Sequence, residues 1–142
     1  MPHAKRTIRI NAPVDQVFAF FTTPANDASW RGGVKEMRAH GEPAVGSIVH
    51  QVIAGPMGKS INADIEITDY TPTSRYAFRA VSGPFRPTGS YDFTRVDVGT
   101  DVTFTLAGDI SGIKKLMMEK PIQKSMAAEM AALDTAKEIL ER

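Results

Sequence analysis

Residues 8–18 read IRINAPVDQVF, and this stretch predicts a strand that passes directly into a helix. Ile8 and Ile10 alternate with polar residues, which is the period-2 pattern of a strand with one buried face. Pro13 ends the strand and suits a first helical turn, where the N–H that proline lacks has no intrahelical partner. After it, apolar residues recur with the spacing of one stripe on an amphipathic helix: Val14, Val17, Phe18 and Phe21.

Six further strand-like runs follow, and turns rich in glycine and proline separate them. They are predicted at residues 34–39, 47–54, 60–70, 75–82, 85–96 and 101–109. The turns are too short for helical crossovers, which need about a dozen residues, so consecutive strands should pair as antiparallel hairpins. Pro24 ends the first helix and is predicted to begin a second short one that leads to Trp30.

Near the C-terminus the hydrophobic period changes from strand to helix. A stripe with three- and four-residue steps predicts a long helix over 113–140: Ile122, Met126, Met130, Leu133, Ala136 and Leu140. Pro121 lacks an N–H for the helical ladder and predicts a kink or a break, with a shorter segment over 113–120 before it. The order of elements predicts an α+β fold in which a curved sheet grips the last helix, an arrangement that can enclose an apolar pocket.

Composition limits the classes of function. A chain of 142 residues suits one domain spanning 1–142, which buries about 70% of its unfolded surface. The 17 basic and 16 acidic residues are scattered, whereas nucleic-acid binders gather positive charge in a patch, so no nucleic-acid partner is expected. The absence of cysteine excludes disulfides and thiolate chemistry. No run approaches the ~18 apolar residues of a membrane span and no N-terminal signal pattern is present, which predicts a cytoplasmic protein without stable membrane insertion.

Several short motifs in a fixed order resemble those of the START-like superfamily, also called SRPBCC, and within it the polyketide cyclase/dehydrase and lipid-transport branch. Each motif is common alone, but together they extend over nearly the whole chain. The matching pieces are Ile8-x-Ile-x-Ala12-Pro13-x-x-x-Val17-Phe18, Trp30 with Val34, Gly46, Ile67-Thr-x-Tyr70-x-Pro72-x-x-Arg75, Gly99-Thr100-x-Val102-Thr103 and Leu140-Glu141.

The resemblance implies a helix-grip fold, with a seven-stranded curved antiparallel sheet wrapped around the C-terminal helix and two short helices after the first strand. Members of the superfamily bind lipids, sterols, polyketides or plant-hormone-like molecules, and some catalyse aromatic cyclisation. We therefore expect a binding or carrier domain for a small hydrophobic ligand. A cyclase/dehydratase enzyme is the first alternative and a protein-interaction or stress-related module the second. No cofactor or metal is expected, and a monomer and a homodimer both remain open.

The predicted cavity combines inward-facing strand residues with methionines of the last helix. Its members are Trp30, His50, Ile65, Tyr76, Phe78, Phe85, Tyr91, Phe93, Phe104, Met117, Met118 and Met126. Because a buried tyrosine hydroxyl usually needs a partner, Tyr76 and Tyr91 are the preferred residues for holding a polar end of the ligand. Loops 55–58 and 83–87 are predicted to gate the cavity.

His50 is the candidate catalytic base, but its orientation depends on the register of its strand. If Ile48 and Val52 face the pocket, His50 does too; if Val49 and Ile53 face it, Gln51 is the inner polar residue. The sequence leaves both alternatives open.

Acidic residues on strand 60–70 are assigned to the outer face. Asp64 and Glu66 alternate with inward isoleucines, so a pair with Arg79 on the next strand is expected in solvent. No acid/base pair is predicted to converge on the pocket, which favours a carrier over an enzyme.

Overall fold

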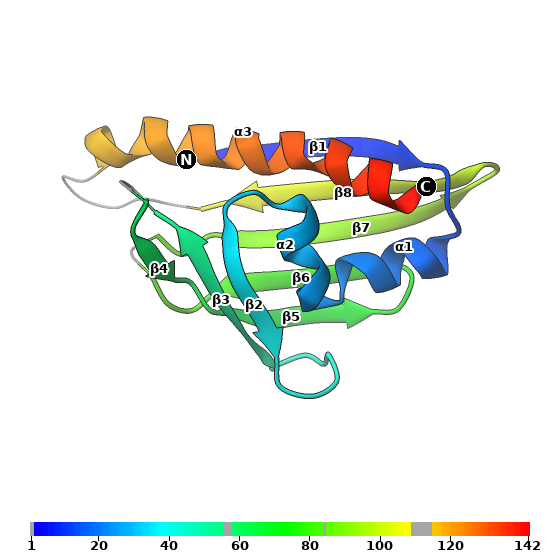
Figure 1. Cartoon of the computed structure of the whole chain (residues 1–142), viewed down its shortest axis with the longest axis horizontal. Coiled ribbons are helices and arrows are strands. Elements are labelled where there is room, and N and C mark those ends of the chain that lie inside the picture. The colour runs from blue at the N-terminus through cyan, green and yellow to red at the C-terminus, as the bar shows by residue number, and fades with distance from the viewer. Residues whose placement is uncertain (1, 56–57, 84, 109–114) are drawn as a thin grey trace.

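The computed structural model describes residues 2–55, 58–83, 85–108 and 115–142 (Figure 1). Its elements in chain order are β1 (His3–Ile10), α1 (Val14–Phe21), the 3₁₀ turn η1 (Pro24–Asn26), α2 (Asp27–Trp30), β2 (Val34–Ala39), β3 (Ile48–Ala54), β4 (Ser60–Asn62), β5 (Ile65–Thr71), β6 (Arg75–Ala80), β7 (Thr88–Val96), β8 (Gly99–Ala107) and α3 (Lys115–Leu140). None of the helices within these ranges is long and apolar enough to cross a membrane.

One curved antiparallel sheet contains all the strands of the described ranges. Seven of them follow the order β1-β8-β7-β6-β5-β3-β2, and the short β4 pairs with β3 beside that path. The predicted α+β helix-grip fold is confirmed, with its seven-stranded sheet, long C-terminal helix and short helices after the first strand. The predicted inner faces of β7 and β8 are also buried, as shown by Tyr91, Phe93, Val102, Phe104 and Leu106.

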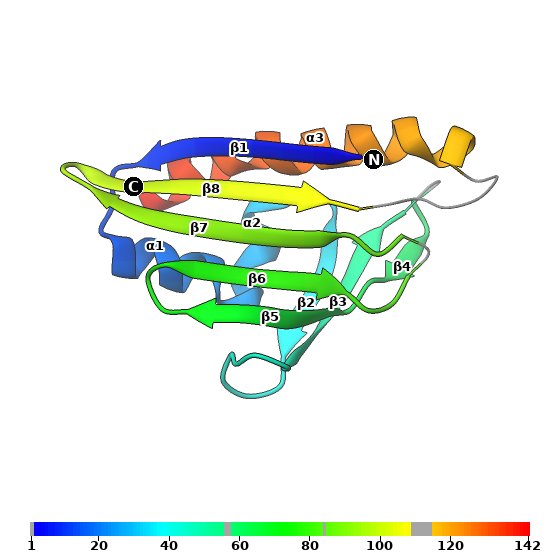
Figure 2. The same cartoon turned by 180° about the vertical axis from the view of Figure 1, so that it is seen from behind.

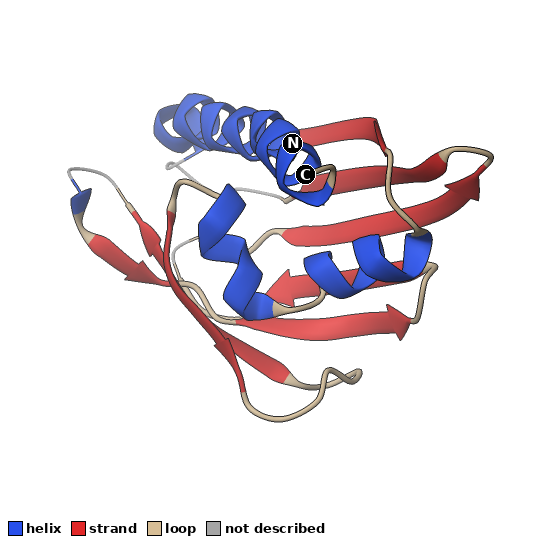
Figure 3. Ribbon diagram, turned by 45° about the vertical axis from the view of Figure 1, so that its right-hand side comes forward, coloured by secondary structure: helices blue, strands red, loops and turns tan. Residues whose placement is uncertain are grey.

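The helices lie on one side of the sheet, as the two opposite views show (Figures 1 and 2). The long helix α3 runs along the β1 edge, and α1 and α2 cover the same concave face nearer its middle (Figure 3). Three side chains tie α3 to β1: Arg6 donates to the Met130 carbonyl at 2.9 Å, Lys137 donates to the Arg9 carbonyl at 2.7 Å, and Gln123 donates to the His3 carbonyl at 2.7 Å. The hydrophobic core therefore lies between the sheet and these helices.

The predicted strand over 60–70 is divided into β4 and β5 at Ala63–Asp64. Side chains replace part of the strand pairing there. Gln51 donates from its side-chain amide to the Ala63 carbonyl at 2.9 Å, and its backbone N–H donates to the Asp64 carboxylate at 3.1 Å. Ile61, Ala63 and Ile65 all remain on the inner face across this bend.

Of the kink or break predicted at Pro121, the break is wrong, because α3 runs without interruption from Lys115 to Leu140. Proline removes the N–H that the Met117 carbonyl would accept, but Met117 is 78% exposed, so water can satisfy that carbonyl. The apolar stripe continues on both sides of the proline. Residues 113 and 114 of the predicted segment lie outside the described residues.

Strand β7 begins at Thr88, three residues later than predicted. Pro87 cannot donate to the ladder, although its carbonyl still accepts from the Ala80 N–H at 2.9 Å. Phe85 consequently lies in an irregular segment before the strand.

Candidate functional site

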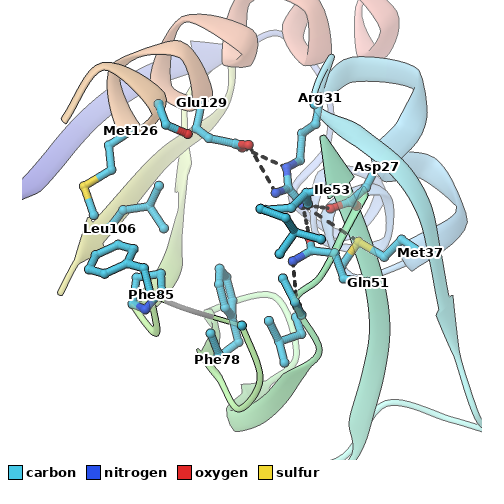
Figure 4. Close-up of a pocket in the computed structure, with 18 of the residues that line it drawn as sticks. Asp27, Arg31, Met37, Gln51, Ile53, Phe78, Phe85, Leu106, Met126 and Glu129 are labelled. Atoms are coloured by element: carbon cyan, nitrogen blue, oxygen red, sulfur yellow. Dashed lines mark hydrogen bonds and ion pairs between the residues drawn. The ribbon is translucent and has the colours of Figure 1, made fainter. Parts of the chain in front are cut away.

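A cavity of about 400 Å³ lies between the concave face of the sheet, α2 and α3. This volume falls in the usual range for small-molecule sites. Aromatic side chains provide much of its wall: Phe21, Tyr76, Phe78, Phe85, Tyr91 and Phe104. Leu106 and Met126 add aliphatic surface from β8 and α3 (Figure 4).

Most residues predicted for the cavity do line it: Ile65, Tyr76, Phe78, Phe85, Tyr91, Phe104, Met118 and Met126. Four do not, namely Trp30, His50, Phe93 and Met117. The loops predicted as gates contribute Gly55, Gly83, Phe85 and Pro87 to the wall, whereas residues 56, 57 and 84 lie outside the described residues.

Trp30 and Phe93 are buried behind the pocket wall rather than in it. Trp30 meets Phe21 edge-on with ring centroids 5.4 Å apart, and Phe93 meets Phe18 at 5.1 Å. The indole N–H of Trp30 has no hydrogen-bond partner among the described residues. These two rings belong to the packing of α1 and α2 on the sheet, so they support the wall from outside.

Met117 is directed into solvent because of the helical period. One residue corresponds to about 100° around a helix, so Met117 and Met118 cannot both face the sheet. Met118 and Ile122 occupy the inner stripe, which leaves Met117 outside.

The register of β3 places Gln51 in the pocket and His50 on the other side of the strand. Val49 and Gln51 are buried, and Ile53 lines the cavity with Gln51. His50 Nδ1 lies 2.9 Å from a carboxylate oxygen of Asp64. The alternative in which His50 is the ring base of the pocket is therefore corrected, and Gln51 is the inner polar residue.

One polar cluster interrupts the apolar wall. It consists of Asp27, Arg31, Gln51 and Glu129, and is called the Arg31 cluster below. Arg31 donates through Nε and Nη2 to the two oxygens of Glu129, at 2.8 and 3.2 Å. Its Nη1 donates to Asp27 and to the Gln51 side-chain carbonyl, both at 2.9 Å (Figure 4). The guanidinium thus joins α2, β3 and α3 at the pocket.

Local structure explains how these side chains converge. Asp27 begins the single turn of α2 and Arg31 directly follows its last residue, and at this spacing of four residues side chains meet. Glu129 lies on the inner stripe of α3 because it follows Met126 by three residues and precedes Leu133 by four.

Burial determines the electrostatics of the cluster. Removal from water raises the pKa of Asp27 to about 6, although Arg31 acts in the opposite direction. Burial alone would lower the pKa of Arg31, but the charges around it, chiefly that of Glu129, hold it above its usual value. One guanidinium is shared by two carboxylates, so Asp27 is incompletely compensated.

Two tyrosine side chains of the core contribute hydroxyl groups to the cavity. Tyr91 is 3% exposed and Tyr76 is 4% exposed, and both line the cavity. Within the described part of the chain neither hydroxyl has a hydrogen-bond partner. Burial raises the pKa of both phenols well above the ordinary value, so they remain protonated and able to donate.

Two carboxylates, those of Asp27 and Glu129, line the pocket, where the sequence led us to expect no converging acidic groups. Asp27 and Glu129 were not recognised as pocket residues from the sequence. A signal was present for Glu129, a charged residue placed within the apolar stripe of the last helix. The pair Asp27–Arg31 was harder to predict, because a helix of one turn such as α2 is too short to show a periodic sequence pattern.

The outer face agrees with the prediction for Glu66, whose carboxylate lies 2.8 Å from Arg79. No group of three or more His, Asp or Glu side chains suited to a metal ion occurs in residues 2–55, 58–83, 85–108 and 115–142.

Comparisons with known proteins agree with this architecture. Residues 1–138 match the family described as polyketide cyclase / dehydrase and lipid transport. A search of curated proteins found no match. The fold is similar to that of TTHA0849 from Thermus thermophilus, with a TM-score of 0.79, 20% identity, and coverage of 96% of this chain and 95% of that one.

Two further structures share the fold. CV1439 from Chromobacterium violaceum aligns with a TM-score of 0.77 and 14% identity, over 99% of this chain and 97% of that chain. The di-domain ARO/CYC StfQ from the steffimycin biosynthetic pathway gives a TM-score of 0.81 and 13% identity, over 98% of this chain but 50% of StfQ. At these identities the similarity shows the fold alone.

Proposed function

Because the chain belongs to the polyketide cyclase/dehydrase and lipid transport family, we propose that it binds a small, largely apolar molecule between its sheet and α3, as a carrier. The observation that supports this most is the cavity of about 400 Å³ walled by aromatic and aliphatic side chains. A ligand that buries about 200 Å² of apolar surface there would gain about 5 kcal/mol before the costs of binding.

In this role residues 1–142 would act as one domain that holds its ligand away from water. Loops 55–58 and 83–87 are the proposed gates, since Gly55, Gly83 and Phe85 stand at the cavity wall. A cytoplasmic location, and the choice between monomer and homodimer, remain predictions.

A cyclase/dehydratase activity in the same cavity is the second candidate, and the Arg31 cluster favours it. A carboxyl group with a pKa of about 6 can exchange a proton near neutral pH, and Asp27 lines the cavity. In such a reaction the Asp27 carboxylate would accept a proton from the substrate, and the protonated Tyr91 hydroxyl would hydrogen-bond to the oxygen that gains negative charge. Asp27→Asn separates the candidates, because an enzyme would lose turnover while a carrier would retain its cargo.

The first experiment is native mass spectrometry of the purified protein, followed by denaturation and identification of any released small molecule. A variant with a filled pocket, Ala80→Phe, is the comparison, because Ala80 lines the cavity. The matched control is Ala39→Phe at an exposed position of β2. We expect an apolar compound with the native protein and the control but not with Ala80→Phe. Equal retention by all three proteins would reject the pocket as the binding site.

A further inference from the structure

The charged groups that line the cavity include more negative than positive groups. Within the described part of the chain they are Asp27, Arg31 and Glu129, so two carboxylates face one guanidinium. With both carboxylates ionised, the wall has a formal charge of −1. The surrounding lining is mostly apolar, and charges act more strongly in such surroundings than in water.

Most hydrogen-bond donors of the Arg31 guanidinium, the positive group of the pocket, are already used within the protein. A guanidinium has five N–H donors, and Arg31 uses one on Nε, two on Nη1 and one on Nη2 for Glu129, Asp27 and Gln51. A ligand carboxylate could gain a two-point bond to Arg31 only by displacing Glu129, which would leave that carboxylate unpaired beside another anion. The cluster is therefore poorly suited to an acid.

The groups that remain available suit a hydrogen-bond donor. Asp27 and Glu129 have oxygen lone pairs beyond those used by Arg31. Tyr91 is 3% exposed, lines the cavity, and its hydroxyl has no partner in the ranges described. Tyr91 lines the same cavity as Asp27, Arg31 and Glu129, and their charges influence the pKa of its hydroxyl. A ligand hydroxyl would donate to a carboxylate and accept from Tyr91.

We infer that the Arg31 cluster selects ligands whose polar end donates hydrogen bonds and has no negative charge, such as alcohols, phenols and amines, and excludes the carboxylic acids of the same skeleton. This inference rests on the proposed function, since it concerns the polarity of the molecule that the apolar cavity holds. Gln51 adds to the selection by fixing one edge of the guanidinium while its own amide donates to Ala63.

The test uses three probes with one carbon skeleton: 2-naphthalenemethanol, 2-naphthylmethylamine and 2-naphthoic acid. Isothermal titration calorimetry at pH 7.5 measures their affinities for the wild-type protein. We expect the alcohol and the amine to bind at least about tenfold more tightly than the acid. Equal affinities, or tightest binding of the acid, would overturn the inference and leave the proposed function standing. Failure of all three probes to bind would count against the proposed function itself, and the inference would fall with it.

The charge of the cluster is then changed at one position. Glu129→Gln makes the formal charge of the wall zero, so the preference for the amine over the acid should fall by about tenfold while the alcohol still binds. Glu138→Gln is the matched control, because Glu138 is an exposed residue of the same helix. An unchanged preference in Glu129→Gln would contradict the inference. If that variant does not fold, the wild-type affinities decide the matter alone.

Discussion

Arg31 and Glu129 are 98 positions apart in the sequence, yet they form a two-point ion pair at the edge of the cavity, with N–O distances of 2.8 and 3.2 Å. This pair joins the C-terminal end of α2 to α3, the helix that the sheet grips. Their side chains are 14% and 22% exposed, so solvent screens the pair only in part.

Replacement of Glu129 should therefore destabilise the protein. In Glu129→Gln the guanidinium keeps Asp27 but loses a charged two-point partner, and we expect the free energy of unfolding to fall by about 1–3 kcal/mol. Urea denaturation measures the loss. Glu138→Gln, the same change at an exposed site on α3, should shift the free energy by no more than about 0.5 kcal/mol. Equal effects in the two variants would contradict a stabilising role of the pair.

Stability should also decrease with rising pH because of Asp27. Its pKa is 3.8 when unperturbed and about 6 in the folded protein, so between these values the folded state binds more protons than the unfolded state. The free energy of unfolding therefore declines from about pH 4 to pH 6, by about 3 kcal/mol for this group. The charged or titratable groups that influence Asp27 are Arg31, Glu129, Tyr76 and Tyr91.

Other carboxyl groups make stability rise with pH, so the contribution of Asp27 is obtained by comparing the free energies of unfolding of the wild type and a variant. Hydrogen bonds lower the pKa of Asp101, Asp134 and Glu141, and the stability they confer is lost as the pH falls. Urea denaturation of wild type and Asp27→Asn across pH 4–7 isolates Asp27. The free energy of unfolding of Asp27→Asn, relative to that of the wild type, should increase as the pH rises. Parallel curves would show that Asp27 does not titrate in this window, and the exposed Asp97→Asn serves as the control.

A methyl group at position 89 should change the pocket more than the fold. Gly89 lies opposite Phe78 in the β6–β7 pair, and a Cβ there would stand 2.3 Å from the Cζ of that ring. In Gly89→Ala the ring must move toward the cavity, so we expect affinity for 2-naphthalenemethanol to fall about tenfold and stability to fall by about 1–2 kcal/mol. Gly32→Ala, where nothing lies within 4 Å of the added carbon, should alter neither.

His50 should have no effect on ligand binding, because its ring contacts Asp64 outside the cavity. We expect His50→Ala to retain the affinity for 2-naphthalenemethanol and to lose up to about 1 kcal/mol of stability, as for a partly exposed pair. Gln51→Leu, one residue along the strand, should change the affinity, because it removes an acceptor from Arg31. Calorimetry on both variants checks the register of β3. A loss of affinity in His50→Ala but not in Gln51→Leu would indicate that His50, and not Gln51, faces the pocket.

The sequence predicted the parts of this protein that depend on periodicity. Ile8 and Ile10, the alternation in β7 and β8, and the stripe from Ile122 to Leu140 each repeat over many residues, and the burial pattern agrees with them. Such repeats are strong signals because every residue of the element contributes to them. The same periodicity explains why Tyr76, Tyr91 and Phe104 were correctly predicted to line the cavity.

Features that depend on a single residue or on distant partners were harder to predict. One position of register separates His50 from Gln51, and the run from 47 to 54 is apolar on both faces. The convergence of Asp27, Gln51 and Glu129 on Arg31 requires three elements to be placed first. The break at Pro121 does not occur, because the packing of the rest of α3 outweighs the loss of one helical hydrogen bond.

The polar residues of the cavity come from segments that contribute little to its aromatic wall. Residues 27 and 31 lie at α2, residue 51 on β3 and residue 129 on α3, whereas the rings of Tyr76, Phe78, Tyr91 and Phe104 come from β6, β7 and β8. The size of an acceptable cargo and the charge that its head group may carry are therefore encoded in largely different parts of the gene. A redesign, or a natural change of ligand, can exchange one property by a few substitutions and leave the other intact.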